Sequence, residues 1–243
     1  MWFRYLRAPY LGGVALIAAG AAMAGMASDA EAALALRLTQ GATVVTVADG
    51  GGSDLDPTVG IISYNSTLSG DVLGSFVTNI STGSSNPVLP PPYPHMDLST
   101  VQISSNGGGT IEVALSQDGF DSMSAVQSFT SAWGVVMNAG QSAFEAYVDP
   151  SDALFSKAGT KVADFSASSP GGFFINAAYG VPVSPSYSVS LYWTITHTGA
   201  GITTGNANLQ IPEPGSLALL GIGLMGMGGL ILRRRRLVTQ AAA

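Results

Sequence analysis

The sequence predicts an all-β protein, an antiparallel two-sheet sandwich that resembles a jelly roll. Short segments in which apolar and polar residues alternate recur along the chain, and turn residues separate them about every ten positions. Helical periodicity is scarce between the two ends of the chain. The 243 residues are enough for one large domain with a packed core. The interpretation of the body as a sandwich depends on these three observations.

The strands are expected in regular succession along the body. They cover residues 43–47, 59–64, 72–78, 100–104, 110–115, 126–136, 144–148, 161–165, 172–178 and 187–197, and residues 208–211 are a candidate eleventh strand. The turn from Asn106 to Gly109 is the best hairpin signal, because Asn and Gly tolerate positive φ. The Asp49–Gly52 stretch is expected to be a loop that ends the first strand.

The last long strand shows how such a sheet would be built. Val189, Leu191, Trp193 and Ile195 fall on one face of the predicted strand, and Ser190, Tyr192, Thr194 and Thr196 fall on the other. We therefore expect the first set in the core and the second set in contact with water.

Composition excludes several classes of function. Charged residues make up 10% of the chain, against about 25% in an ordinary globular domain. Residues 37–209 contain twelve acidic and three basic residues, a net charge of −9, which argues against binding to a nucleic-acid backbone. The chain has no cysteine, so disulfide scaffolds, thiolate metal sites and thiol catalysis are excluded.

The first 32 residues have the organisation of a secretory signal peptide. Arg4 and Arg7 precede an almost uncharged apolar run, and Ala30-Glu31-Ala32 forms a small-residue cleavage site. Cleavage is expected after Ala32, with residues 33–35 (Ala-Leu-Ala) as a second candidate site. An uncleaved N-terminal anchor is the alternative. With cleavage after Ala32, residues 33–210 form the expected exported domain.

The C-terminal end contains three signals in a fixed order. Pro212-Glu213-Pro214 ends the body, because the two prolines cannot continue a helix or a strand. An apolar segment at 217–232 follows, then Arg233, Arg234, Arg235 and Arg236. Sixteen helical residues span about 24 Å, slightly less than a bilayer core of about 30 Å. The arginines place residues 237–243 as a cytoplasmic tip and the body outside the inner membrane.

This tripartite segment, residues 211–236, resembles the PEP-CTERM sorting signal of Gram-negative bacteria, which is also labelled an ice-binding protein C-terminal domain. The resemblance implies that an exosortase-type membrane protease/transpeptidase recognises the Pro-Glu-Pro motif and the arginine block. It also implies an inner-membrane precursor that is later delivered to the cell surface or an exopolysaccharide matrix. A plain single-pass anchor with a stop-transfer cluster is the alternative.

The body resembles, more loosely, a recurring domain of PEP-CTERM proteins with no assigned activity. The resemblance lies in a Thr-rich first strand, an Asp-Gly loop, the Met96-Asp97-Leu98 segment and a final Thr-x-Thr-His-Thr-Gly strand from Thr194. It adds no site residues to those that the sequence itself offers.

Few residues are candidates for chemistry. His95 and His197 are the only neutral-pH bases, and no G-x-S-x-G nucleophile motif exists, so we expect no catalysis. Asp49, Asp54 and Asp56 lie within one Gly-rich loop and could collect a calcium ion, although Asp residues also cap turns. No other cofactor is expected.

Two surface patterns could bind extended ligands. Thr194, Thr196 and Thr198 form one Thr-x-Thr-x-Thr ladder, whereas a flat ice-binding array needs such ladders on several strands. Four aromatic residues could stack on sugar rings or belong to the core, namely Tyr93, Trp133, Tyr147 and Tyr179. The sequence therefore predicts a non-enzymatic surface or matrix protein. A carbohydrate-binding module is the second hypothesis, and a calcium-assisted adhesin the third.

Overall fold

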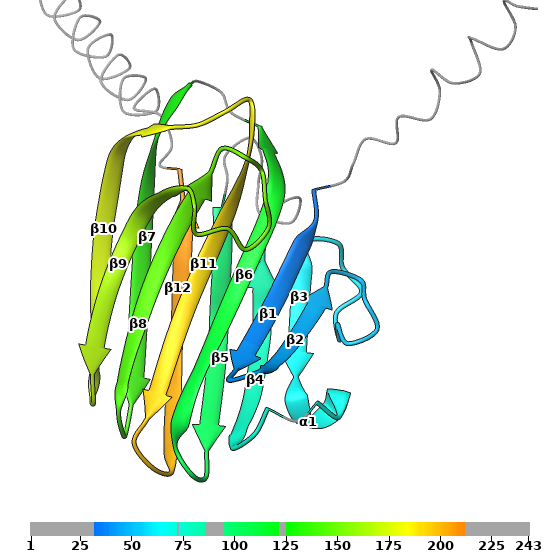
Figure 1. Ribbon diagram of the computed structural model, residues 1–243, viewed down its shortest axis with the longest axis vertical. Helices are drawn as coiled ribbons and strands as arrows, with labels where there is room; N and C mark the ends of the chain where they lie inside the picture. The colour runs from blue at the N-terminus through cyan, green and yellow to red at the C-terminus, as the bar shows by residue number, and fades with distance from the viewer. Residues whose placement is uncertain (1–31, 72, 86–94, 122–124, 212–243) are drawn as a thin grey trace, which may run out of the picture. The chain divides into compact units, whose positions relative to one another are not determined.

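The computed structural model describes residues 32–71, 73–85, 95–121 and 125–211 (Figure 1). These residues form twelve strands and one short helix. In chain order they are β1 (Leu34–Gln40), β2 (Thr43–Ala48), β3 (Ile61–Asn65), α1 (Ser66–Ser69), β4 (Phe76–Ser84), β5 (His95–Ser105), β6 (Gly109–Asp121), β7 (Val126–Met137), β8 (Gln141–Asp149), β9 (Thr160–Ser168), β10 (Gly171–Pro182), β11 (Ser186–His197) and β12 (Gly201–Gln210).

The strands form two six-stranded antiparallel sheets. The order in sheet A is β2-β1-β6-β11-β8-β9, and the order in sheet B is β10-β7-β12-β5-β4-β3. From β5 onward the chain follows a jelly roll, in which β6-β11-β8-β9 faces β5-β12-β7-β10. The hairpin β1-β2 extends sheet A beyond β6, and β3-β4 extends sheet B beyond β5. The predicted fold class is confirmed.

The core lies between the sheets and is rich in stacked aromatic rings. Trp133 of β7 lies 5.3 Å from the ring of Phe174, 6.0 Å from Trp193 and 6.2 Å from Phe144, measured between ring centroids. Val189, Leu191, Trp193 and Ile195 are all buried on the inner face of β11, as the alternating pattern predicts. Because no cysteine is present, this apolar layer holds the sheets together without covalent links.

Two elements of the structure, β1 and α1, were not predicted from the sequence, and a third, β12, is longer than predicted. Strand β1 carries buried Leu34, Leu36 and Leu38 on alternate positions, a clear strand pattern placed directly after the predicted cleavage site. Strand β12 is much longer than the expected 208–211, because its Gly, Thr and Asn residues carry little apolar signal. Helix α1 is a single turn that Asn65 caps by accepting hydrogen bonds from two backbone N–H groups.

Strand β1 begins and strand β12 ends at the same end of the sandwich, which is uppermost in Figure 1. The longer connections 49–60 and 150–159 lie at that end as well. The predicted signal peptide (1–32), apart from Ala32, and the predicted transmembrane helix (217–232), arginine block and tip (237–243) fall outside the described residues. Within the described ranges, no helix is both long and apolar enough to cross a membrane.

Candidate functional site

The outer face of sheet A is covered over part of its length by residues 150–159, the connection between β8 and β9. Phe155 from this loop packs against a small outer cluster made of Ala114, Tyr147 and Tyr192. Ser190 and Tyr192 are therefore each 1% exposed. The prediction that both face water was wrong, because alternation assigns a residue to a face but does not reveal a loop that covers the face.

Hydrogen bonds to residues of β6, β8 and β11 hold this loop on the sheet. The Phe155 backbone N–H donates to Ser116 Oγ of β6 (2.9 Å), and Ser188 Oγ of β11 donates to the Ala153 carbonyl (2.7 Å). Ser151 N donates to Asp149 Oδ1 (2.9 Å) where the loop leaves β8. Ser116 Oγ also lies 2.8 Å from Ser190 Oγ, so one buried hydroxyl connects β6, β11 and the loop.

All three basic residues of the body lie around this covered region. Arg37 Cζ is 4.3 Å from the Phe155 ring centroid, and Lys157 Nζ is 4.0 Å from that of Tyr192. Lys161 Nζ lies 5.6 Å from the Tyr147 ring. At these distances the cations are attracted to the negative faces of the rings.

Acidic residues alternate with the two lysines across the same face. Lys157 Nζ lies 3.0 Å from Glu112 and 3.6 Å from Glu145, and Lys161 pairs with Glu145 and with Asp164 (3.1 Å). Burial alone would raise the pKa of Glu145, but the ion pairs with Lys161 and Lys157 outweigh it and lower that pKa. The glutamate therefore stays ionised.

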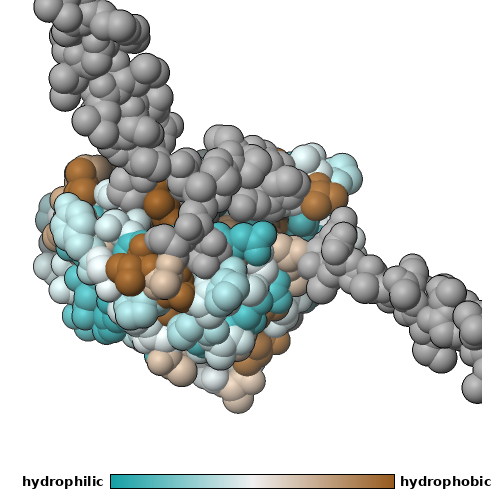
Figure 2. Space-filling model, turned by 90° about the horizontal axis from the view of Figure 1, so that it is seen from above, coloured by the Kyte–Doolittle hydropathy of each residue, from teal (hydrophilic) through white to brown (hydrophobic). Residues whose placement is uncertain are grey.

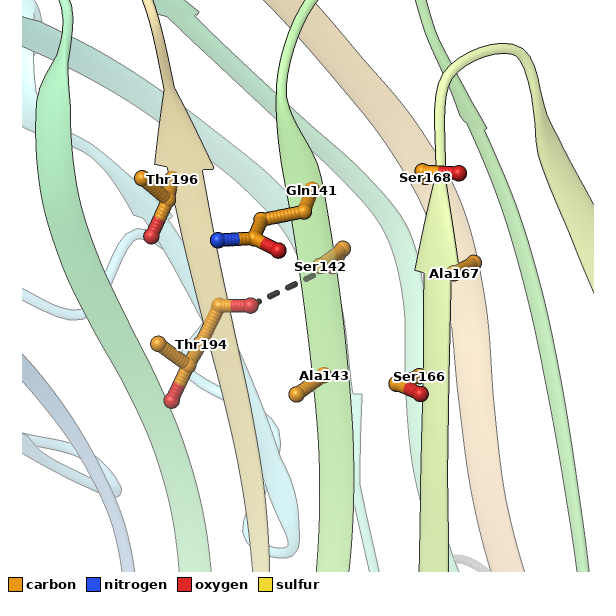
Figure 3. A pocket seen from close by; sticks show the side chains of 8 residues that line it. All are labelled: Gln141, Ser142, Ala143, Ser166, Ala167, Ser168, Thr194 and Thr196. Atoms are coloured by element: carbon orange, nitrogen blue, oxygen red, sulfur yellow. Dashed lines mark hydrogen bonds between the residues drawn. The ribbon is translucent and has the colours of Figure 1, made fainter.

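Beyond the covered region the outer face of sheet A opens into a groove of about 480 Å³. Residues of three neighbouring strands line it, namely Thr194 and Thr196 of β11, Gln141, Ser142 and Ala143 of β8, and Ser166, Ala167 and Ser168 of β9 (Figure 3). The amide of Gln141 extends toward β11 between the two threonines. The groove is hollow because its floor consists of small side chains.

The strand register aligns the groove residues in cross-strand rows. Thr196 pairs with Gln141, which pairs with Ser168 on the far side of β8. Thr110 of β6 extends this row, since its Oγ1 lies 2.9 Å from Thr196 Oγ1. The second row contains Thr194, Ala143 and Ser166. The groove therefore presents hydroxyl and amide groups and no charged side chain on its lining.

A second hollow, of about 450 Å³, lies on the outer face of sheet B. Its floor is made by Gly134 and Gly205, and its walls include Phe173, Thr204 and Asn206. Phe173 is 70% exposed, and its ring comes within 3.3 Å of the position that a Cβ on Gly134 would occupy. The glycine thus leaves room for an exposed aromatic ring to approach the sheet.

The four predicted stacking aromatics are dispersed. Trp133 is fully buried in the core and Tyr147 is 8% exposed beneath the loop, so neither offers a ring face to an external sugar. Tyr179 of β10 is 79% exposed, on the same strand as Phe173. Tyr93 lies outside the described residues. The exposed Phe173 was missed, although alternation of Phe173 and Phe174 in an edge strand places one of them outside.

His197, at the end of β11, is buried against β5 and β12 and does not line a surface groove. Its Nδ1 lies 2.7 Å from Ser105 Oγ and its Nε2 lies 2.8 Å from Thr203 Oγ1. Desolvation lowers the pKa of His197, so the ring is neutral in the folded protein. Because His197 is 2% and Ser105 8% exposed, this Ser–His pair connects strands and has no access to substrate.

His95 lies two residues before Asp97 on β5. Burial lowers the pKa of His95, against the opposing effect of the Asp97 charge. Desolvation likewise raises the pKa of Asp97. Both side chains are partly buried, and no hydrogen bond joins them.

The three predicted calcium ligands accept hydrogen bonds from the backbone of their own loop and of β3. Asp49 Oδ2 accepts from Gly60 N (2.6 Å), Asp54 Oδ1 from Asp56 N and Ser63 N, and Asp56 Oδ1 from Thr58 N (2.9 Å). These bonds match the turn-capping alternative, and the hydrogen bond from Thr58 lowers the pKa of Asp56. Among the described residues no group of three or more His, Cys, Asp or Glu side chains could hold a metal ion. A calcium titration is the direct test of the prediction.

The predicted threonine ladder is only two residues long on the sheet. Thr194 and Thr196 lie on the outer face of β11, whereas Thr198 lies in the exposed hairpin before β12. Gln141, Ser166 and Ser168, which complete the groove, were not identified from the sequence. Their signal is weak, because isolated Ser and Gln residues mark any wet strand face and their register with β11 is not visible in the sequence.

Comparison with known proteins identifies the tail. The family model of the PEP-CTERM protein-sorting motif matches residues 210–236, which confirms the resemblance of this segment. The match implies an exported bacterial precursor that passes the membrane and is processed by an exosortase-type system. No match was found among curated proteins.

Solved structures share the sandwich architecture at low identity. TmCBM61 in complex with beta-1,4-galactotriose aligns over 52% of this chain and 84% of its own, with 8% identity and a TM-score of 0.32. The carbohydrate-binding module CBM36 in complex with calcium and xylotriose aligns over 43% and 76%, with 10% identity and a TM-score of 0.25. Infectious bursal disease virus Gx strain aligns over 84% and 53%, with 15% identity and a TM-score of 0.27. Superpositions this loose carry no argument about ligands.

Proposed function

We propose that this chain is a non-enzymatic protein of the bacterial cell surface or extracellular matrix, delivered through its C-terminal sorting signal. The observation that carries the proposal is the position of the sorting motif, whose match begins at residue 210, the last residue of β12. An exosortase-type enzyme could therefore remove everything after β12 without removing a strand. The jelly roll would remain intact as the delivered product.

The surface of the body suits a matrix role. Ser, Thr, Asn and Gln provide most of its polar groups, so its solubility depends little on charge. Seen from the end where the loops gather, hydrophilic areas are interrupted by separate hydrophobic patches (Figure 2). The histidine with the closest hydroxyl partner, His197, is used to connect strands. These features support a scaffold rather than a catalyst.

The sorting step is tested by replacing Glu213 with Ala in the full-length chain. We expect the variant to stay in the inner membrane at unprocessed mass, because the Pro-Glu-Pro motif is disrupted while the apolar segment remains. Fractionation and intact mass measure both effects. Gln210→Ala, which lies in the matched segment but outside the tripeptide, is the control. Normal maturation of the Glu213 variant would restore the plain-anchor alternative.

Carbohydrate binding is the second candidate function, favoured by the groove on sheet A. Its rows of hydroxyl and amide groups could donate to and accept from sugar hydroxyls, and its volume of about 480 Å³ is sufficient for part of a chain. The floor has no exposed aromatic ring, so binding there would depend on hydrogen bonds.

Residues 33–210 are suitable for this test, because all twelve strands and nearly the whole core lie within them. We expect saturable binding to an exopolysaccharide on a glycan array, weakened about tenfold by Gln141→Ala, which removes a central amide. Thr204→Val in the hollow of sheet B is the matched control. A scaffold without sugar affinity would show no saturable binding for any of the three proteins.

A further inference from the structure

The start of β1 lies beside a carboxylate that is positioned for a free amino group. Ala33 N lies 2.6 Å from Asp118 Oδ1 of β6. Ala32 and Ala33 are exposed and precede the strand, whereas Leu34 is 2% exposed and pairs with Gln117. The change from exposed residues to a buried and paired strand therefore lies beside the predicted cleavage site.

From this geometry we propose that the exported protein begins at Ala33 and that its α-ammonium group forms an ion pair with Asp118. The proposal rests on the export of the chain and deepens it, because it assigns the processing site and a residue that receives the product. Hydrolysis of the Ala32–Ala33 peptide bond by a signal peptidase consumes one water. Ala32 leaves as a carboxylate, and the new amine of Ala33 takes up a proton.

Cleavage changes the Ala33–Asp118 contact from an amide–carboxylate hydrogen bond into an ammonium–carboxylate ion pair. An amide N–H donates one proton without net charge, whereas an ammonium donates up to three and carries a full positive charge. The body contains twelve acidic and three basic residues between positions 37 and 209, so an added cation is favourable in its field. Asp118 is the acidic side chain in direct contact with it.

The alternative cleavage site fits the structure poorly. A chain cut after Ala35 would lose Leu34 and Ala35, which are 2% and 6% exposed. Both residues pair with β6, and Ala35 also pairs with β2. Its ammonium group would belong to Leu36, which is fully buried. Placing an unpaired charge there is strongly unfavourable. The structure therefore selects Ala33 over the second candidate.

Neighbouring acidic groups have other partners. Asp49 Oδ2 accepts from Gly60 N (2.6 Å), and the Asp49 backbone N–H donates to the Leu34 carbonyl (3.1 Å). Asp152 Oδ1 accepts from the backbone N–H of Gly119, the residue after Asp118 on β6 (2.8 Å). Asp152 Oδ2 accepts from Ser186 Oγ of β11. These contacts hold the irregular last part of β6, after Asp118, in place. Replacing Asp118 therefore tests its pairing with the amino group of Ala33 without removing these other contacts.

The experiment uses the protein recovered from the cell envelope. N-terminal sequencing and intact mass are expected to give Ala33 as the first residue. The pKa of the α-amino group, followed by NMR, is expected above its usual value of about 7.8, and Asp118→Asn should lower it by about half a unit. Asp121→Asn, on the same strand but without this contact, is the control and should leave it unchanged.

Each outcome bears on a different claim. A chain in the envelope that still begins at Met1 would match the uncleaved N-terminal anchor and would overturn the proposed cleavage, whereas protein recovered only from the cytoplasm would contradict export itself. An exported chain with another first residue would overturn the assignment of Ala33. An α-amino pKa that is the same in the parent protein and in Asp118→Asn would overturn the ion pair, even if the cleavage site were correct.

Discussion

Along β11 the outer face of sheet A is divided into two regions. From Ser188 to Tyr192 it is buried beneath residues 150–159, whereas Thr194 and Thr196 remain partly exposed in the groove. Both regions follow the same alternating pattern in one continuous strand. The difference teaches that a loop from another part of the chain, and not the strand itself, decides which half of a face is available to a ligand.

The largest expected effect separates the two regions by stability. Tyr192→Ala removes a fully buried ring from under the loop and should lower the free energy of unfolding by about 3 kcal/mol. Thr194→Ala, two residues further on and open to solvent, should change it by less than about 0.5 kcal/mol. Urea denaturation of both variants measures the contrast, and equal losses would contradict the division.

The next effect tests how the loop is fastened. Ser116→Ala removes the acceptor for Phe155 N and the hydroxyl contact to Ser190, which leaves buried polar groups without their partner. The expected loss is about 1.5 kcal/mol in the urea transition. Ser166→Ala in the open groove is the control and should be nearly neutral. A neutral Ser116 variant would mean that the loop is held mainly by Phe155.

A third prediction concerns the pH dependence of stability and His197, the last residue of β11. The pKa of His197 is lowered by burial, so the unfolded chain binds a proton at higher pH than the folded one. Stability from His197 is therefore complete above about pH 6.5 and falls as the pH drops below it. Each unit of pKa difference is worth about 1.4 kcal/mol. Urea midpoints at pH 7.5 and 5.5 should differ less in His197→Gln than in the parent.

The smallest effect concerns the lysines above the covered region. Lys157→Met retains an apolar stem over Tyr192 and removes the charge that pairs with Glu112 and Glu145. Since the Lys157 side chain is 42% exposed, we expect a loss of only about 0.5 kcal/mol. The loss should shrink in 0.5 M salt. A loss of several kcal/mol would show that the cation is essential to the loop.

The sequence predicts the sandwich well and the groove poorly, for one physical reason. Alternation within β11 is local, so the burial of Val189, Leu191 and Trp193 follows from the strand alone. The groove depends on which residues of β8 and β9 stand opposite Thr194 and Thr196, and this register is set by long-range pairing. The burial of Tyr192 likewise depends on a contact with Phe155, which lies 37 positions away in the chain.

The C-terminal sorting signal, unlike the groove, could be predicted from the sequence alone. The PEP-CTERM signal is a linear motif read by another protein, so its residues carry it without any folded context. The contact between Asp118 and Ala33, in contrast, could not be predicted from a linear motif. The two residues are 85 positions apart, and only the pairing of β1 with β6 brings them together.

The placement of the basic residues has a practical consequence. Lys157 and Lys161 are the only lysines in the chain, and both lie on the outer face of sheet A close to the groove. Amine-reactive dyes or coupled sensor surfaces would attach there, or at the amino terminus, and would present sheet B outward while obstructing the hydroxyl rows. Attachment through an engineered cysteine on β4, in a chain that has no cysteine of its own, would leave sheet A free.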